Sequence, residues 1–227
     1  MSYFGLAPEN VFPYLVRAMV LFTMLPVHEF AHGFAADRLG DDTPRMQGRL
    51  TLNPFAHLDW TGSILMMLIG IGWGKPVSVD MRKFKHPRRD MAITAFAGPL
   101  SNLLLSLLLM IIYKILAAAA PERTLYSGAV MIVNILAMAC FINISLAVFN
   151  LIPLPPLDGS KIFGILLPEK FYWAMLRYQR QIMFIFMLLL IFGVLSLPIQ
   201  FAAVRIFNFF DEITMPIERL MQLWTRS

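Results

Sequence analysis

The sequence predicts an all-α polytopic membrane protein with about four transmembrane helices, a short re-entrant segment and a small membrane-associated β element. The first reason is composition, because 58% of the 227 residues are hydrophobic and only 15% are charged, whereas a soluble domain carries about 25% charged residues. The second is that the apolar residues form long runs, which leave no room for a second, soluble core. The third is that basic residues gather in loops beside these runs, as they do in membrane proteins.

Four apolar runs are long enough to cross a bilayer, for which about 20 mostly apolar residues are needed. The candidate spans are residues 11–36, 91–119, 128–152 and 181–204. Together they predict a single transmembrane domain over residues 1–204. The first ten residues contain no basic residue, so we expect the first run to be a permanent span rather than a cleavable signal peptide.

Three further segments do not read as ordinary spans. Residues 61–74 are apolar but short and contain four glycines, which favours a re-entrant segment covered by protein. Residues 38–60 are polar, and the alternation at residues 49–52 predicts short strands. His57 in this stretch is expected to be a structural hydrogen-bonding residue. Residues 205–227 have apolar residues at helical spacing, which predicts a C-terminal amphipathic helix at the membrane interface.

The distribution of basic residues predicts the orientation of the chain. Six basic residues lie in the loop at 75–90 and four in the loop at 153–180, but only one lies at 120–127. The positive-inside rule therefore places both basic loops in the cytoplasm. The net charge of +5 is accounted for by this topology, so we expect no nucleic-acid partner. The expected location is the inner or plasma membrane of a prokaryotic cell.

One short motif in the first span carries metal chemistry. His28, Glu29 and His32 form the pattern H-E-x-x-H. On a helix, residues four apart share a face, so both imidazoles can reach one ion. The glutamate between them is then placed to act as a general base in hydrolysis. Ionisable residues at the end of an apolar run are costly and usually functional, which favours a metal site over a helix end that emerges into water.

A hydrolytic zinc ion usually has three protein ligands, so a third ligand must come from elsewhere. The best acidic candidate is Asp158. It follows a short segment that contains three prolines, Pro153, Pro155 and Pro156. Prolines forbid a regular helix through this stretch, and the resulting rigid break would hold the carboxylate in one orientation. The alternative is that Asp158 and Gly159 form an ordinary turn.

The chain resembles the site-2 proteases, which are intramembrane zinc metalloproteases. The resemblance rests on three motifs in order, each on a different predicted span. They are the H-E-x-x-H motif at residues 28–32, a G-x-x-x-N motif from Gly98 to Asn102, and an N-x-x-P-x-x-x-x-D-G motif from Asn150 to Gly159. The match covers residues 11–165. No inserted peptide-binding domain interrupts it, so the chain resembles the compact branch that lacks a PDZ domain.

The resemblance implies a role for each matching residue. His28, His32 and Asp158 would bind one zinc ion per chain, and Glu29 would be the catalytic base. Asn150 would also be catalytic, by positioning the substrate or stabilising the oxyanion.

Two more asparagines lie on the predicted spans. Asn102 would bind substrate, with a helix-packing hydrogen bond as the equal alternative. Asn143 lies seven residues before Asn150 on the same helical face, and we expect it to be a packing residue.

The function implied by the resemblance is hydrolysis of peptide bonds within or near the transmembrane segments of membrane protein substrates. The expected partners are such substrates and the lipid bilayer, and the site would lie toward the cytoplasm. Two other classes of protein stay open. A membrane metal-handling or transport protein would explain the histidines but not Glu29. A catalytically silent scaffold would not need Glu29 at all.

Overall fold

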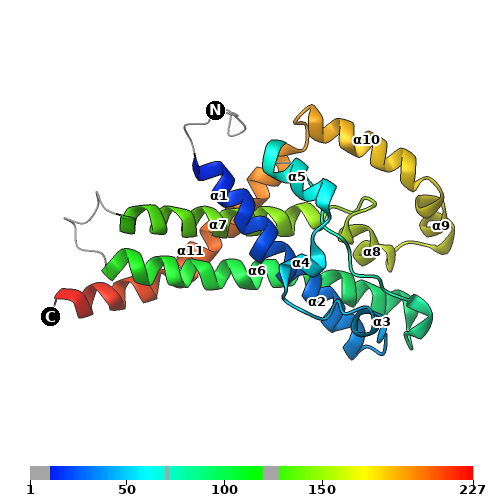
Figure 1. Cartoon of the computed structure of the whole chain (residues 1–227), viewed down its shortest axis with the longest axis horizontal. Helices are drawn as coiled ribbons and strands as arrows, with labels where there is room; N and C mark the ends of the chain where they lie inside the picture. The colour runs from blue at the N-terminus through cyan, green and yellow to red at the C-terminus, as the bar shows by residue number, and fades with distance from the viewer. Residues whose placement is uncertain (1–10, 70–71, 120–127, 227) are drawn as a thin grey trace.

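The computed structural model describes residues 11–69, 72–119 and 128–226, and the elements that it describes are helices (Figure 1). The predicted outer loop at 120–127 lies outside the described residues, as do residues 70–71 of the predicted re-entrant segment. Within the described residues, three helices are long and apolar enough to cross a membrane, at residues 14–38, 87–118 and 132–150. The prediction of an all-α membrane protein is therefore confirmed, with spans close to the first three that the sequence indicated.

The first span consists of three helical pieces in line, and the last of them carries the histidine motif. It consists of α1 (Val11–Met19), a π-helical turn (Val20–Met24) and α2 (Leu25–Arg38). Pro26 lies in the first turn of α2. Proline has no N–H to donate to the preceding turn, and the widened π-helical turn lies directly before it.

The second span, α6 (Pro87–Ala119), is the central helix of the fold. It contacts α2, α7 (Gly128–Asn150), α8 (Asp158–Gly164) and α11 (Ser196–Arg226). Figure 1 shows α6, α7 and α11 side by side, with the α1–α2 rod crossing them. The buried core between these three helices consists of Met110, Cys140, Ile144, Ala203 and Phe210.

The predicted fourth span at 181–204 is divided between two helices. Helix α10 (Gln179–Ile191) stops before Gly193, whose φ of +69° lies in the left-handed region that ends a helix. Helix α11 then begins at Ser196 and continues through the predicted C-terminal helix. With α9 (Glu169–Arg177), α10 forms a pair bent by 70° that is apolar enough to count as a fourth, broken span.

Helix α11 is attached to α6 by an ion-pair cluster. The side chain of Lys114 is only 3% exposed, and its Nζ lies 2.8 Å from Asp211 Oδ1 and 3.2 Å from Glu218 Oε2. A buried ammonium group requires such partners. The amphipathic helix is thus packed along the bundle over much of its length, and its location at the membrane interface stays a prediction.

The predicted re-entrant segment contains α5 (Trp60–Ile69), a ten-residue helix. Ten residues extend about 15 Å, about half of the hydrocarbon thickness. The chain after α5 returns along it, since a Cβ on Gly62 would lie 2.1 Å from Trp73 O. Arg17 Nη1 donates to Met67 O at 2.6 Å and to Leu68 O at 3.0 Å, so carbonyls at the end of α5 have a partner within the protein.

The predicted β element does not appear among the described residues. The stretch at 38–60 instead contains two single-turn helices, α3 (Thr43–Met46) and α4 (Pro54–His57), and one isolated bridge joins Leu58 to Gly74. Within the alternating segment, Thr51 O is bonded to a side chain rather than to a neighbouring strand, since His57 Nε2 lies 2.8 Å from it, and Arg49 N donates to Pro44 O in the preceding turn. His57 is fully buried there, as expected of a structural residue.

Candidate metal centre

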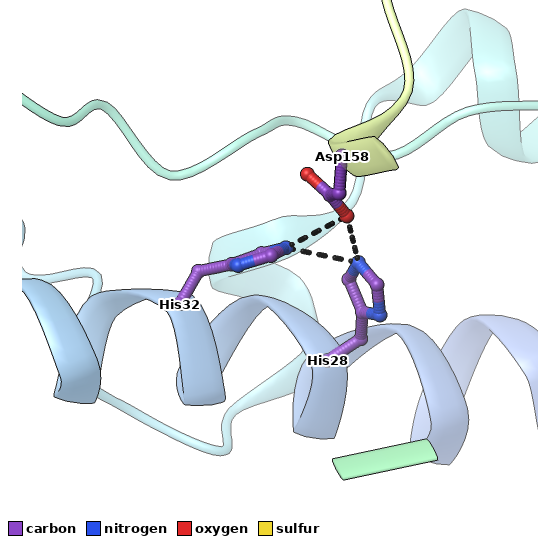
Figure 2. A group of neighbouring side chains, drawn as sticks. All are labelled: His28, His32 and Asp158. Atoms are coloured by element: carbon purple, nitrogen blue, oxygen red, sulfur yellow. Dashed lines mark hydrogen bonds and ion pairs between the residues drawn. The ribbon is translucent and has the colours of Figure 1, made fainter. Parts of the chain in front are cut away.

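Two buried histidines on α2 and one buried aspartate at the start of α8 meet at a single point (Figure 2). His28 Nε2 and His32 Nε2 lie 3.0 Å apart, and each lies 3.1 Å from Asp158 Oδ2. The histidines come together because they are one helical turn apart, whereas Asp158 is 126 residues beyond His32. The pairing of these two distant motifs is therefore a property of the fold.

Asp158 is held in place by the irregular segment between α7 and α8. Leu157 is extended, with φ −69° and ψ 158°, and α8 begins at Asp158 itself. Gly159 packs against the end of α7 so closely that a Cβ would lie 2.3 Å from Ile152 O. The absent side chain lets α8 approach α7, which aims the aspartate at α2. Lys161 Nζ lies 3.6 Å from Asp158 Oδ1 on the outer side of the carboxylate.

Burial by itself would raise the pKa of the Asp158 carboxyl. The hydrogen bonds and charges of His28 and His32 outweigh burial, so this pKa lies well below its usual range. The carboxyl is thus present as a carboxylate, which is the form that binds a metal ion.

The second nitrogen of each imidazole also has a partner. His32 Nδ1 lies 2.8 Å from Thr94 O on α6, and because the carbonyl can only accept, Nδ1 carries a proton, while Nε2 faces Asp158. His28 Nδ1 lies 3.2 Å from Asn102 Nδ2, also on α6. The contact of His32 with a backbone carbonyl fixes the orientation of its ring and is typical of histidines that bind metals.

The three side chains fit zinc by donor type and by spacing. Two imidazole nitrogens and one carboxylate oxygen are a common set of protein ligands in catalytic zinc sites. Tetrahedral bonds of about 2.1 Å separate neighbouring ligand atoms by about 3.4 Å, close to the 3.0–3.1 Å found between these atoms. Within the described parts of the chain, this is the one group of three histidine, cysteine or acidic residues found close enough to share an ion.

Glu29 and Asn150 line the same cavity as the three candidate ligands, with a volume of about 160 Å³. Glu29 Oε2 accepts a hydrogen bond of 2.8 Å from the backbone N–H of Val77. Asn150 Nδ2 donates to Leu146 O at 3.0 Å, within its own helix. No sequence pattern pointed to Val77, because its contribution is a backbone group in an irregular loop.

Asn102 does not line this cavity. Its side chain is 1% exposed, and the contact that it makes is with His28. Binding of substrate by Asn102 stays a prediction, and its position favours a supporting role for the histidine instead.

Gly98 allows α6 to lie directly against both imidazoles. A Cβ at this position would lie 2.4 Å from His32 Nε2 and 2.7 Å from His28 Cε1. Such separations are far below van der Waals contact, and the ring atoms have no flexible end that could move aside.

We expect Gly98→Ala to weaken metal binding by about 1–3 kcal/mol, the usual cost of overpacking a filled interior. Zinc affinity, measured by competition with a chelator of known affinity, checks this. Gly33→Ala on α2 is the matched control, because its Cβ would meet Pro44 Cβ at 3.4 Å, an ordinary contact. Equal zinc affinity in Gly98→Ala and in the unaltered protein would contradict the expected close packing.

A family model and several known proteins are similar to this chain in sequence. A model of Peptidase family M50 matches residues 115–194. YwhC of Bacillus subtilis, named as a candidate zinc metalloprotease, is 40% identical over 169 residues, which make up 74% of this chain and 75% of that protein.

More distant relatives carry the same kind of name. Rip2 of Mycolicibacterium smegmatis is 32% identical over 149 residues, 64% of this chain and 53% of that protein. MJ0611 of Methanocaldococcus jannaschii is 31% identical over 116 residues, 50% of this chain and 52% of that protein. The chain thus spans about half the length of these two relatives. No solved structure matches it.

Proposed function

Because this chain belongs to peptidase family M50, the site-2 proteases, we propose that it is an intramembrane zinc metalloprotease. It hydrolyses peptide bonds within or near the transmembrane segments of membrane protein substrates. The observation that carries this proposal is the convergence of His28, His32 and Asp158 beside Glu29, at the C-terminal end of an apolar span. A buried cluster of this kind in a membrane helix is costly unless it serves a function.

In this proposal His28 and His32 hold one zinc ion through Nε2, and Asp158 holds it through Oδ2. When bound, zinc acts as a Lewis acid that polarises a carbonyl group and activates water at neutral pH. The three ligands leave room beside them, since the cavity of about 160 Å³ opens between the ligands and Glu29.

Glu29 is the proposed general base. The Val77 N–H holds Oε2 at 2.8 Å, which leaves Oε1 to take the proton from the attacking water. Glu29 then returns this proton to the leaving amine as the peptide bond breaks. The hydrogen bond from Val77 keeps the carboxylate facing the cavity between these two steps.

Asn150 is the proposed second catalytic residue. It lines the cavity from the end of α7, on the side of Asp158. One N–H of its amide bonds to Leu146 O, and the other is available to donate to the oxyanion that develops on the scissile carbonyl.

The proposed orientation places this site near the cytoplasmic face of a prokaryotic inner or plasma membrane. The support is the excess of basic residues at 75–90 and 153–180, the second of which contains Asp158. A site there can receive water without exposing the hydrophobic interior of the bilayer.

A metal transporter is the main alternative, and two observations weigh against it. A transport path needs a series of polar sites, whereas the described residues offer one group that could hold an ion. The relatives are named as metalloproteases rather than as transporters.

The direct test is removal and return of the metal. The substrate is a single-span membrane protein with asparagine and proline placed in its span, because a stable helix hides its peptide bonds. We expect a chelator to reduce cleavage by the purified protein to background, and one equivalent of zinc to restore it. Mass spectrometry of the products locates the cut.

The outcomes separate the functional classes. A cut within or next to the span supports intramembrane proteolysis, whereas cleavage confined to soluble tails contradicts it. Zinc flux into sealed vesicles without any cleavage supports the transporter. Cleavage that persists after complete removal of zinc overturns the proposed mechanism.

A further inference from the structure

Two fully buried asparagines beside the candidate metal centre have side-chain groups without partners. Asn143 on α7 is 0% exposed, and neither its Nδ2 nor its Oδ1 has a hydrogen-bond partner. Asn102 on α6 is 1% exposed, and its Oδ1 is likewise unpartnered. Unpaired amide groups in an apolar interior are expensive. Asn102 contacts His28 directly, and the level of Asn143 in the bundle follows from the register of the helices.

Two independent registers place Asn143 at the level of Asn102 and His28. Helices α6 and α7 are antiparallel, since the start of α6 and the end of α7 line the same cavity. Ser106 Oγ donates to Cys140 O at 3.2 Å, and Cys140 Sγ donates to Ser106 O at 3.3 Å. One turn closer to the cavity along each helix brings Asn102 opposite Asn143.

The second register comes from α2. Met24 and Ala139 belong to one buried cluster. Because α2 and α7 run in the same direction toward the cavity, one further turn on each brings His28 to the level of Asn143. Both residues are four positions beyond the clustered pair. The two asparagines and the histidine therefore share one layer of the bundle.

The hydrogen bond from Asn102 to His28 is possible only in the His28 tautomer that cannot bind a metal ion through Nε2. Nδ2 of an amide can only donate, so His28 Nδ1 accepts it, and the ring proton is then on Nε2, facing Asp158 Oδ2. A metal ion needs the lone pair of Nε2, which moves the ring proton to Nδ1. In that state Nδ1 requires an acceptor, and Asn102 Nδ2 cannot serve.

We propose that Asn102 and Asn143 are positioning residues that set the tautomer of His28. When Nε2 binds zinc, the Asn102 amide turns by about 180° and presents Oδ1 to the Nδ1–H; the terminal torsion of asparagine is broad and roughly two-fold. The Asn143 side chain carries both a donor, Nδ2, and an acceptor, Oδ1. It can therefore bond to either group of the Asn102 amide, whichever one points away from the His28 ring. Rotation of its side chain or one buried water bridges the two amides.

This inference rests on the proposed zinc site and deepens it. It assigns the unpartnered groups a role in metal binding, and it removes Asn102 from contact with substrate. Asn143 is too deeply buried to meet a substrate either.

The experiment compares zinc affinity with the stability of the zinc-free protein in four variants. Asn102→Leu has neither donor nor acceptor, and we expect zinc affinity to fall about 10–100-fold, as for other residues that support a metal-binding histidine. The carboxylate in Asn102→Asp can accept a hydrogen bond from Nδ1–H, and we expect zinc affinity at or above that of the unaltered protein. Asn143→Leu should reduce zinc affinity by less than Asn102→Leu.

The stability of the zinc-free protein should rank Asn102→Leu and Asn102→Asp in the opposite order to their zinc affinities. Asn102→Leu replaces a poorly bonded amide by an apolar group of similar size and should melt at or above the temperature of the unaltered protein. Asn102→Asp buries a charge and should melt lower. A residue that only packed α6 against its neighbours would lose zinc affinity and stability together.

Ser106→Ala is the matched control, since it removes a polar group from the same α6–α7 interface and leaves both side-chain amides in place; among the described residues, Ser106 Oγ bonds only to the backbone carbonyls of Asn102 and Cys140. Unchanged zinc affinity in this variant is expected. A loss as large as that of Asn102→Leu would overturn the inference in favour of general packing. Zinc affinity that is unchanged in Asn102→Leu, or lowered in Asn102→Asp as much as in Asn102→Leu, also overturns it. Failure of the unaltered protein to bind zinc overturns the proposed function itself, and this inference with it.

Discussion

Replacement of Asp158 by alanine is expected to lower zinc affinity more than about 100-fold, beyond the ~10–100-fold loss typical of residues that merely support a ligand. The reason is geometric: Asp158 Oδ2 lies 3.1 Å from both Nε2 atoms, so its loss leaves two imidazoles as the protein ligands. It also removes the negative charge that offsets the ion in a buried site. Zinc per chain in the purified protein, together with chelator competition, measures the effect.

Asp90→Ala controls for the loss of a buried aspartate. Asp90 is also buried and lies in the first turn of α6, where its Oδ2 accepts from His86 N. This variant should be less stable but should keep its zinc. Zinc retained in Asp158→Ala but lost in His28→Ala would mean that the third ligand is another residue.

Replacement of Glu29 by glutamine is expected to reduce kcat/KM about 10²–10⁴-fold while zinc content stays at the level of the unaltered protein, because general acid–base catalysis contributes about that factor. Glutamine keeps the shape of the side chain, and its carbonyl can still accept from Val77 N–H. It cannot take a proton from water at neutral pH. Cleavage of the single-span substrate and zinc content are measured on the same preparation.

Asp37→Asn is the matched control, because it makes the same kind of change on α2 at a residue that pairs with Arg45. It should cleave at the normal rate. Full activity in Glu29→Gln would exclude this glutamate as the base. Loss of zinc from that variant would mean that Glu29 helps to hold the metal, and the two roles would then have to be reassigned.

The location of the spans and the helical face that carries the histidines could both be predicted from the sequence, because both are local properties of the chain. A helix satisfies its own backbone in lipid, so a run of apolar residues specifies a span without knowledge of its neighbours. The repeat of 3.6 residues likewise puts His28 and His32 on one face whatever the rest of the chain does. Both properties are local, and both agree with the structure.

Where non-local contacts decided the outcome, the sequence was a weaker guide. The alternation at residues 49–52 predicted strands, but a strand needs a partner, and His57 bonds to the backbone there instead. The predicted span at 181–204 was continuous by composition. In the structure, Gly193 interrupts this span. Helix α11 begins at Ser196 rather than at residue 205, and it packs along α6 and α7.

The sequence by itself determined the membrane character of the chain, the two histidines on one helical face, and Asp158 as a candidate partner by its setting and by resemblance. Only the tertiary structure decided that Asp158 meets the histidines, that Gly98 lets α6 touch both rings, and that Asn102 faces His28 rather than the cavity. These contacts depend on the register between helices. Register is set by the packing of many side chains at once, and no single segment of the sequence encodes it.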